Sequence, residues 1–316
     1  IEYTNDYNGA KQDGIGMTQA TIRNGRRMST ALCYLDPARG RANLTIQANA
    51  MTTSLILDDK RCVGVRYIVG GKSREVRAAR EVIVSTGSIN SPQMLELSGI
   101  GQPELLKGLG IEVRHELRGV GENLRDHYSP RMKWRVPASL GMTYNDKARG
   151  LGLVWQALRY AFTDKGLLGL PASPIRAYIR TRDGLNSPNA AISWVPFLIG
   201  ENFQLAKQSG VTAIMNILRS ESTGSIHLAS ADAATPPAIR FNFLSAQLDR
   251  DVTLEAMRIT RRIMTAPAMR DITSDEIAPG IDIDSDDDLL DWVRNNAETT
   301  YHPVGTCKMG SDPMAV

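Results

Sequence analysis

Four histidines, at positions 115, 127, 227 and 302, are the side chains of this sequence best suited to proton transfer near neutral pH. His302 has the most suggestive setting, because Pro303 and Gly305 follow it in a loop that would hold an imidazole out from a surface. An imidazole held in this way takes the proton of a hydroxyl group and returns it. No spacing of serine, aspartate or cysteine marks a nucleophilic triad, so the loop alone leaves a catalytic base and an ordinary histidine both open.

The other three histidines have plainer settings. His115 lies in a strand-like run between charged residues, and His227 stands at the start of the run 228–230. Both are interpreted as ordinary surface or sheet residues. His127 ends the segment 122–127, where a role in fixing the loop competes evenly with a role in a site.

The segment 84–92, which reads V-S-T-G-S-I-N-S-P, is a second candidate. It joins a short apolar run to a helix that Ser91 is expected to cap, with Pro92 at the first helical position and Gly99 after the end. Small residues at the carboxyl end of a strand permit the close approach of a flat cofactor. They also suit a tight strand-to-helix turn, and the pattern leaves both interpretations open.

Other patterns argue against further sites. Glycine pairs at 14–16, 99–101 and 119–121 lack the third glycine of the dinucleotide fingerprint G-x-G-x-x-G, so they predict turns. The acidic run 282–288 lacks the residue order of a calcium loop and indicates a helix start, so no metal site is predicted. Cysteines 33, 62 and 307 are far apart and include no C-x-x-C, which argues against a disulfide framework and fits a reducing cytoplasm.

The elements that must position these residues change in character along the chain. Up to about residue 128 we expect strands at 44–57, 63–69, 72–78, 82–84 and 111–117, a hairpin turn at 70–71 and helices at 92–98 and 103–109. Beyond it we expect strands at 129–136, 192–198, 211–218 and 239–243, and helices at 151–162, 248–264 and after 288. The second part therefore indicates a sheet with few crossover helices.

The length and composition of the chain limit the classes of function that it can have. The 316 residues, 42% of them hydrophobic, suit one large or two ordinary globular domains. A net charge of +3 and an aromatic content of 6% make nucleic-acid binding a poor expectation. No run approaches the roughly 18 apolar residues of a transmembrane helix. The chain begins with Ile1 and stops shortly after a glycine-containing stretch, so we expect it to be a fragment.

Taken together, these residues resemble the glucose-methanol-choline (GMC) family of FAD-dependent oxidoreductases. Residues 87–101, G-S-I-N-S-P-Q-M-L-E-L-S-G-I-G, fit that family's second signature throughout. Residues 119–127 look like its G-V-G-x-N-L-x-D-H segment, and residues 302–310 like its H-P-x-G-T-C-x-M-G segment. The resemblance covers most of the chain, is weakest over 140–223, and is greatest to the bacterial choline and aliphatic alcohol dehydrogenase branch.

The resemblance implies the site residues. His302 would be the base that takes the alcohol proton while hydride passes from the substrate carbon to the N5 atom of FAD, and Tyr301 would be an aromatic wall of the pocket. The strand 43–57 would pass the adenine end of FAD, with Thr52 where relatives usually have a valine that offers its backbone. The small residues implied in the cofactor turn are Gly87, Ser88, Asn90 and Ser91.

The resemblance also implies the fold. We expect a mixed α/β and α+β chain, with a partial Rossmann-like FAD-binding portion at 1–128 and a substrate portion at 129–316 built on a largely antiparallel sheet flanked by helices. Two family segments have no counterpart here, namely the Rossmann fingerprint and the closing segment that partners the base, so we expect truncation at both ends.

The predicted activity is oxidation of a primary alcohol to an aldehyde. A choline-like substrate would need aromatic faces, which Trp134, Trp155 and Trp194 could supply, although core packing is expected of each. Two alternatives stay open: a non-catalytic fragment unable to hold FAD, and a hydroxynitrile lyase of the same family. The electron acceptor, oxygen or a quinone, is left open, and a quinone would allow membrane association of an otherwise cytoplasmic protein.

Overall fold

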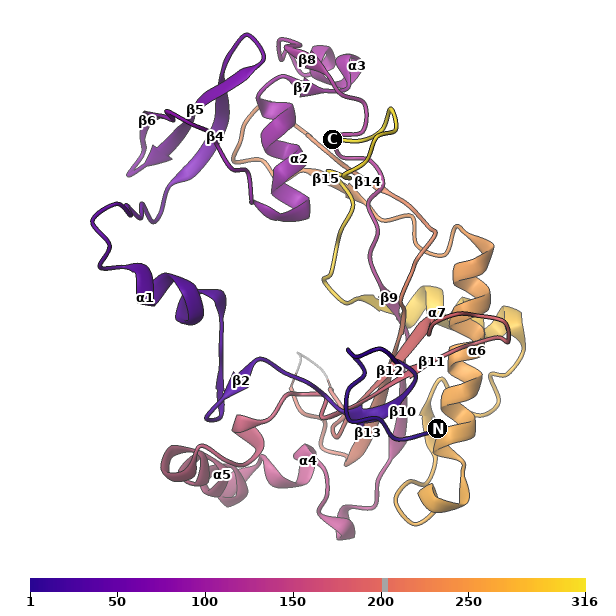
Figure 1. The fold of residues 1–316 in the computed structure, drawn as a ribbon. Coiled ribbons are helices and arrows are strands. Elements are labelled where there is room, and N and C mark those ends of the chain that lie inside the picture. The colour runs from indigo at the N-terminus through magenta and orange to yellow at the C-terminus, as the bar shows by residue number, and fades with distance from the viewer. Residues whose placement is uncertain (201–203) are drawn as a thin grey trace. The chain divides into compact units, whose positions relative to one another are not determined.

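The computed structural model describes residues 1–200 and 204–316, and its chain divides into two compact units (Figure 1). Unit 1 comprises residues 1–44, 128–219 and 247–299, and unit 2 comprises residues 45–127, 220–246 and 300–316. Residues 201–203 of the predicted substrate portion lie outside the described residues. Among the helices of the described part, none has both the length and the apolar character needed to cross a bilayer.

Unit 1 is built on a six-stranded sheet in which every neighbouring pair is antiparallel. Its strands, in spatial order, are β1 (Gly14–Met17), β11 (Ile175–Ile179), β12 (Ala190–Val195), β13 (Gly210–Ile217), β10 (Arg131–Arg135) and β16 (Glu276–Ala278). The largely antiparallel sheet expected from the sequence is confirmed. The expected boundary at residue 128 stays a prediction, and the structure adds that β1, before it, pairs with β11, after it.

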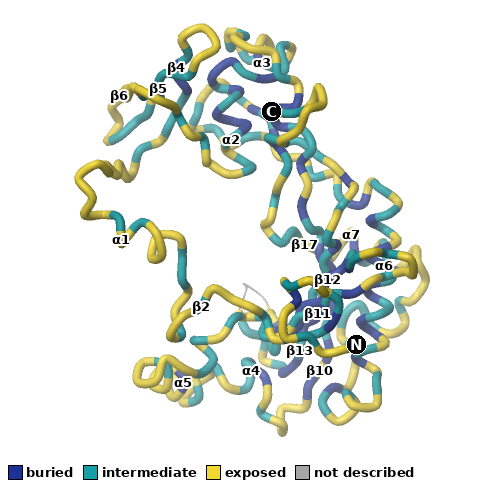
Figure 2. The backbone as a smooth tube through the Cα atoms, in the orientation of Figure 1, coloured by how far each residue is buried: buried dark blue, intermediate teal, exposed yellow. Residues whose placement is uncertain are grey.

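The core of unit 1 lies between this sheet and helix α6 (Gln247–Met264), which contacts β12 and β13. Successive residues of a strand point to opposite faces, so the buried Met132 and Trp134 of β10 share one face. Figure 2 colours the buried residues of the chain dark blue. The amphipathic helix predicted over 248–264 is confirmed, because its buried residues include Val252, Ala256 and Met264.

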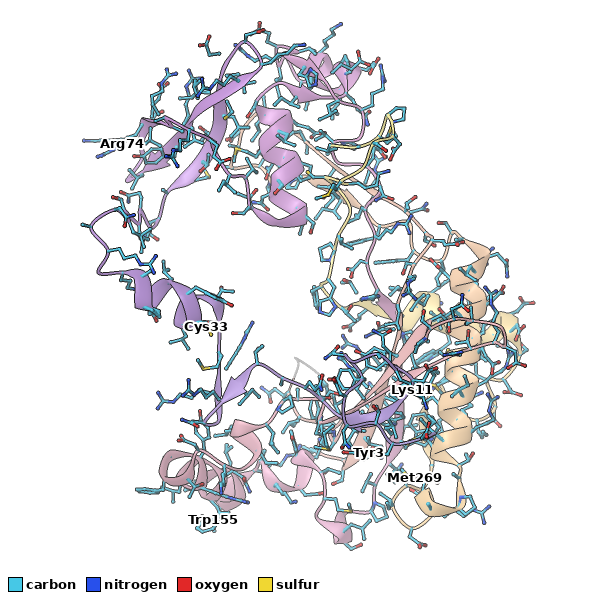
Figure 3. The ribbon with its side chains drawn as sticks, viewed as in Figure 1. Tyr3, Lys11, Cys33, Arg74, Trp155 and Met269 are labelled. Carbon is cyan, nitrogen blue, oxygen red and sulfur yellow. The ribbon has the colours of Figure 1, made fainter. Side chains whose placement is uncertain are left out.

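The remaining elements of unit 1 are smaller. Trp155 corrects one expectation: it lies on α5 (Gly150–Thr163) with 63% of its surface exposed, so this tryptophan does not pack in a core (Figure 3). Trp134 and Trp194 are buried, as expected. The elements are β2 (Ile22–Arg23), β3 (Arg26–Arg27), the π-helix Ala31–Leu35, α1 (Asp36–Ala38), β9 (Tyr128–Ser129), α4 (Tyr144–Lys147), α5 (Gly150–Thr163), α7 (Asp286–Asn296), β17 (Glu298–Thr299) and the 3-10 turns Ala138–Leu140, Leu167–Gly169 and Pro267–Met269.

Unit 2 combines a three-stranded antiparallel sheet with helix α2 (Gly87–Leu97). The sheet contains β4 (Met51–Asp58), β5 (Arg61–Val69) and β6 (Lys72–Arg77). The predicted hairpin turn is confirmed, since Gly70 and Gly71 have φ of 56° and 73°, which favours glycine. The other elements are β7 (Ile100–Gly101), α3 (Pro103–Gly108), β8 (His115–Glu116), β14 (Ser225–His227) and β15 (Ala238–Arg240).

Four strand expectations in unit 2 differ from the structure, and the one over 239–243 is limited to β15, which ends at Arg240. Residues 43–50 precede β4 without strand structure, and the strand expected over 111–117 is limited to β8. The apolar run 82–84 forms no strand, and Ile83 is 78% exposed. A buried strand needs neighbours for its backbone groups, and none of the described segments pairs with this run.

Candidate active site

All the predicted site residues belong to unit 2. They come from three of its segments: strand β4, the start of helix α2, and the loop that begins after residue 300. In chain order they are Thr52, Gly87, Ser88, Asn90, Ser91, Tyr301 and His302.

The loop that carries His302 lies between the start of α2 and the segment 119–127. On one side, Ser88 Oγ donates a hydrogen bond of 2.6 Å to the carbonyl oxygen of Pro303. On the other side, Arg125 and Val304 exchange two backbone hydrogen bonds, each 2.9 Å long. The segments that resemble three separate family motifs are therefore in direct contact, which the sequence alone could not show.

Asp126 fixes the backbone at His302. Its carboxylate is buried, and Oδ1 accepts the N–H of His127 at 2.7 Å and the N–H of His302 at 3.1 Å. The His302 side chain is exposed, with the ring of His127 edge-on at a centroid distance of 5.8 Å. Thr300 Oγ1 lies 3.5 Å from His302 Nδ1. The arrangement presents an imidazole on a backbone that a buried carboxylate holds in place.

Tyr301 has an unusual backbone conformation. Its φ of 61° lies in the left-handed region, which a residue with a bulky side chain adopts rarely and at some cost in free energy. The side chain is 73% exposed. Such strained positions are concentrated at functional sites, and here the strain falls on the residue just before His302.

Helix α2 begins five residues earlier than expected. It starts at Gly87, which has a φ of 80°, and it contains Pro92 in its interior. Proline has no N–H, so the carbonyl of Ser88, four residues earlier, loses its helical donor. The buried Thr306 supplies a replacement, because its Oγ1 donates a hydrogen bond of 2.5 Å to that carbonyl. This contact from a distant segment explains why the sequence pattern misplaced the helix start.

Ser91 does not cap the helix, contrary to expectation. Its hydroxyl lies 3.1 Å from that of Thr86, and no side chain caps α2 at its N-terminus. Asn90 is exposed, and a Cβ added to Gly87 would meet nothing within 4 Å. The start of α2 is therefore an open surface of small polar residues with the partial positive charge of a helix N-terminus.

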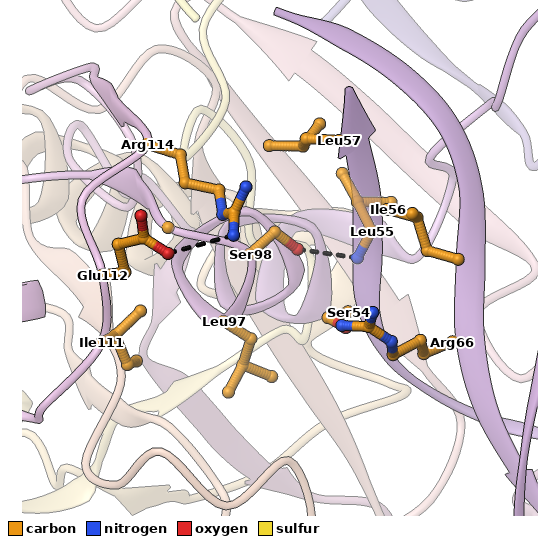
Figure 4. Close-up of a pocket in the computed structure, with 11 residues that line it drawn as sticks. Ser54, Leu55, Ile56, Leu57, Arg66, Leu97, Ser98, Ile111, Glu112 and Arg114 are labelled. Atoms are coloured by element: carbon orange, nitrogen blue, oxygen red, sulfur yellow. Dashed lines mark hydrogen bonds and ion pairs between the residues drawn. The ribbon is translucent and has the colours of Figure 1, made fainter. Parts of the chain in front are cut away.

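Thr52 lies in the edge strand of its sheet. β4 pairs with β5 on one side only among the described residues, and the pairing is irregular between Thr52 and Ser54. On its other side β4 is tied to α2, because the hydroxyl of Ser98 accepts the N–H of Leu55 at 2.8 Å beside a cavity of about 230 Å³ (Figure 4). An edge strand leaves backbone groups available to a ligand.

His227, Glu96 and Glu122 form a partly buried cluster next to this site, and the sequence pattern assigned a site role to none of them. His227 Nδ1 lies 2.7 Å from Glu96 Oε1, and His227 Nε2 lies 3.0 Å from Glu122 Oε1. Glu96 is fully buried, and its Oε2 accepts the N–H of Leu228 at 2.8 Å. His227 is the last residue of strand β14, and its contact with Glu96 joins residues 131 positions apart, which the sequence pattern could not predict.

The cluster changes the titration of its neighbours. The hydrogen bond to Glu96 is the main cause that raises the pKa of His227 above 6.5, although burial acts in the opposite direction. Burial also raises the pKa of the Cys307 thiol, and the charge of Glu96 adds to that effect. The cluster thus joins α2, the segment 119–124 and β14 through one imidazole.

Sequence profiles of one family match both ends of the chain. The N-terminal and C-terminal profiles of GMC oxidoreductase match residues 2–129 and 220–316, respectively. The chain therefore belongs to the GMC oxidoreductase family, which confirms the resemblance predicted from its motifs.

Similar proteins include oxygen-dependent choline dehydrogenases. The one from Acinetobacter baumannii is 40% identical over 323 residues, and the one from Photobacterium profundum is 40% identical over 319 residues. Each alignment covers 99% of this chain but only 57% and 55% of the respective relative. The chain thus spans somewhat more than half the length of the relatives it matches.

Solved structures share the fold. A formate oxidase aligns with a TM-score of 0.87 and 26% identity, covering 97% of this chain and 57% of its own. A formate oxidase variant of Aspergillus oryzae, described for its FAD modification, has a TM-score of 0.85 at 25% identity and covers 93% and 56%. Pyridoxine 4-oxidase from Mesorbium loti, with a TM-score of 0.83 at 24% identity and coverage of 100% and 58%, shows the fold alone.

Proposed function

We propose that this chain forms part of a FAD-dependent enzyme that oxidises a primary alcohol to an aldehyde, with His302 as the base. One observation carries the proposal. The exposed imidazole of His302 stands on a backbone fixed by Asp126, and its loop is bonded through Ser88 to the open start of α2. The proposed base and the proposed cofactor surface thereby lie in one unit and are joined by a hydrogen bond.

FAD fits the residues on this surface. The turn formed by Gly87, Ser88, Asn90 and Ser91 has small side chains, no capping side chain and open space at the glycine. Thr52, on an edge strand, would meet the adenine end through its backbone, so a threonine serves there as well as another side chain. When bound, FAD supplies the acceptor for the hydride that leaves the alcohol carbon.

His302 would remove the hydroxyl proton of the alcohol. A neutral imidazole accepts such a proton near neutral pH, and its efficiency depends on being held at the right position. Asp126 holds the backbone of His302, and the strained Tyr301 would place an aromatic side chain beside the substrate. We propose Tyr301 as a pocket wall and His302 as the proton acceptor.

The similar proteins support the reaction class. Oxygen-dependent choline dehydrogenases are named for an alcohol substrate and for oxygen, so we propose an alcohol substrate for the whole protein and oxygen as one acceptor to test. We further propose that residues 1–128 are the FAD-side portion and residues 129–316 the substrate portion. A cytoplasmic location stays a prediction.

The test is made on the longest native chain that contains these 316 residues. The protein is incubated with FAD, freed of unbound cofactor and mixed with a panel of primary alcohols without oxygen. The proposal predicts a retained flavin spectrum that an alcohol bleaches. Retained flavin that no alcohol bleaches would contradict the reaction, and cyanide release from a mandelonitrile-like compound would indicate a lyase instead.

A further inference from the structure

The ring of His227 lies between two carboxylates from different segments of unit 2. Nδ1 lies 2.7 Å from Oε1 of Glu96, near the end of α2, and Nε2 lies 3.0 Å from Oε1 of Glu122, in the segment 119–127. An ionised carboxylate only accepts hydrogen bonds, and a neutral imidazole has a single N–H. Both contacts therefore form together when the imidazole is protonated and donates from both nitrogens.

The surroundings of His227 favour this protonated form. Among the described residues, Glu96 and Glu122 are the charged groups that act on the ring, and strand β15 has the uncharged Ala238 opposite it. Burial and the charge of Glu96 raise the pKa of the nearby Cys307 thiol, so the thiol is uncharged near neutral pH. The imidazolium thus offsets two carboxylates that would otherwise repel each other.

The two carboxylates are not held equally. Glu96 is fully buried, and its other oxygen, Oε2, accepts the N–H of Leu228 at 2.8 Å. Glu122 is partly exposed, and the oxygen that faces His227 also accepts from the side-chain amide of Gln102 at 2.8 Å. Loss of the imidazolium would therefore displace Glu122, which lies in a loop, more readily than Glu96, which lies on a helix.

The segment that carries Glu122 lies against the loop of His302. Gly121, next to Glu122, donates its N–H to the carbonyl of Thr306 at 2.9 Å. Asp126, four residues after Glu122, accepts the N–H of His302 at 3.1 Å. A displacement of Glu122 would therefore reach the backbone that holds the proposed base.

We propose that His227 is a positioning residue for the oxidation, because its doubly donating imidazolium holds the segment 119–127 where Asp126 can fix the backbone of His302. The inference rests on the proposed function and adds to it a residue that acts through Glu122 and Asp126. Because Glu96 has a second contact of its own, retention of FAD should not depend on His227.

The test follows flavin bleaching by an alcohol at a series of pH values, in the longest native chain, loaded with FAD. His227→Gln lacks the imidazolium, so we expect it to retain flavin but to bleach about tenfold more slowly near pH 6.5. This deficit should shrink as pH rises through the folded pKa of His227, which lies above 6.5, because the unchanged protein then loses the same contact. His115→Gln, which replaces an exposed histidine of the same unit, is the matched control and should bleach like the unchanged protein.

A second substitution should restore the rate. Glu122→Gln, added to His227→Gln, removes the repulsion between the carboxylates, so we expect bleaching within about threefold of the control. Where His227→Gln does not fold, Glu122→Gln alone should weaken the fall in rate at high pH. The proposal is overturned if His227→Gln bleaches like the control, if its deficit is equal at every pH, or if the double variant is as slow as His227→Gln.

Amide hydrogen exchange distinguishes failure of this proposal from failure of the proposed function, because it needs no turnover. We expect the amide of His302 to exchange faster in His227→Gln than in the double variant or in His115→Gln. If no alcohol bleaches the unchanged protein, the proposed function fails, and exchange still shows whether His227 holds the segment 119–127. Equal exchange at His302 in His227→Gln and His115→Gln would overturn the positioning role.

Discussion

Thr306 donates a hydrogen bond at the start of helix α2 that Pro92 cannot donate, because proline has no N–H. The carbonyl of Ser88 would accept from the N–H of residue 92 in an ordinary helix, and it accepts instead from the Thr306 hydroxyl at 2.5 Å. The same Ser88 donates through its own hydroxyl to Pro303. One residue of the proposed cofactor turn is thus bonded twice to the loop of the proposed base.

Replacing Thr306 with valine should destabilise the protein. The change keeps the shape of the buried side chain but leaves the Ser88 carbonyl without its donor, at a cost of about 1–3 kcal/mol in the free energy of unfolding. Thr306→Ser keeps the hydroxyl and is the matched control. Urea unfolding checks both variants, and equal losses from valine and serine would show that the hydroxyl has no such role.

At the scale of single residues, the sequence could identify the residues proposed to act on the substrate and cofactor, but not the residues that hold them in place. His302 and the turn 87–91 belong to motifs that are recognisable along the chain. Asp126 and Glu96 form hydrogen bonds with residues 176 and 131 positions away, respectively. The spacing of residue types along a sequence does not predict such contacts. Only the folded chain brings the buried carboxylates to the imidazoles.

Among the elements, a buried hydroxyl joins β4 to the end of α2. Ser98 Oγ accepts the N–H of Leu55 and donates to the carbonyl of Met94 at 2.6 Å. Because Ser98 ends α2 and Leu55 lies in β4, this hydroxyl sets the distance between two elements of the proposed cofactor surface.

We expect Ser98→Ala to loosen this junction. The buried N–H of Leu55 loses its acceptor, which should cost about 1–3 kcal/mol and speed amide hydrogen exchange at Leu55. Ser54→Ala, in the same strand, is the control. Unchanged protection of the Leu55 amide in Ser98→Ala would contradict the junction.

The His227 cluster predicts a pH dependence of stability. The folded pKa of His227 is raised above the unfolded value of 6.5, so its contribution is fully present below that value and is lost as pH rises through the folded pKa. The free energy of unfolding should therefore fall as pH rises from about 6.5 through the folded pKa, and His227→Gln should flatten this trend.

The control for the pH prediction is His115→Gln, because His115 is an exposed histidine of the same unit. It should keep the slope of the unchanged protein. Unfolding in urea at a series of pH values measures all three proteins. A free energy that stays level or rises over this interval would exclude a stabilising role for the charged imidazole.

Elements with strong local signals were predictable. Helix α6 has apolar residues on one face, and the β5–β6 hairpin has two glycines at its turn, so both followed from pattern. The run 82–84 is apolar but has no strand partner among the described residues, and α2 starts early through a distant hydroxyl. Both misses depend on tertiary contacts that override local preference.

For the molecule as a whole, chain order and compactness do not coincide. Each unit takes three separate segments of the chain, and the sheet of unit 1 uses β1 from the first 17 residues. The change in the expected helices and strands along the sequence predicts a single division of the chain. Nothing in the sequence predicts that β1 pairs with β11, because the residues of a strand do not specify which distant strand it will pair with.

If His302 removes the alcohol proton, as we propose, the rate at which an alcohol bleaches the flavin depends directly on this side chain. The measurement compares His302→Gln with His115→Gln, both loaded with FAD and mixed with the same alcohol near neutral pH. We predict that both retain flavin and that His302→Gln alone slows by about 100-fold or more, the usual contribution of a general base. Bleaching of His302→Gln within a few-fold of the control would contradict the account.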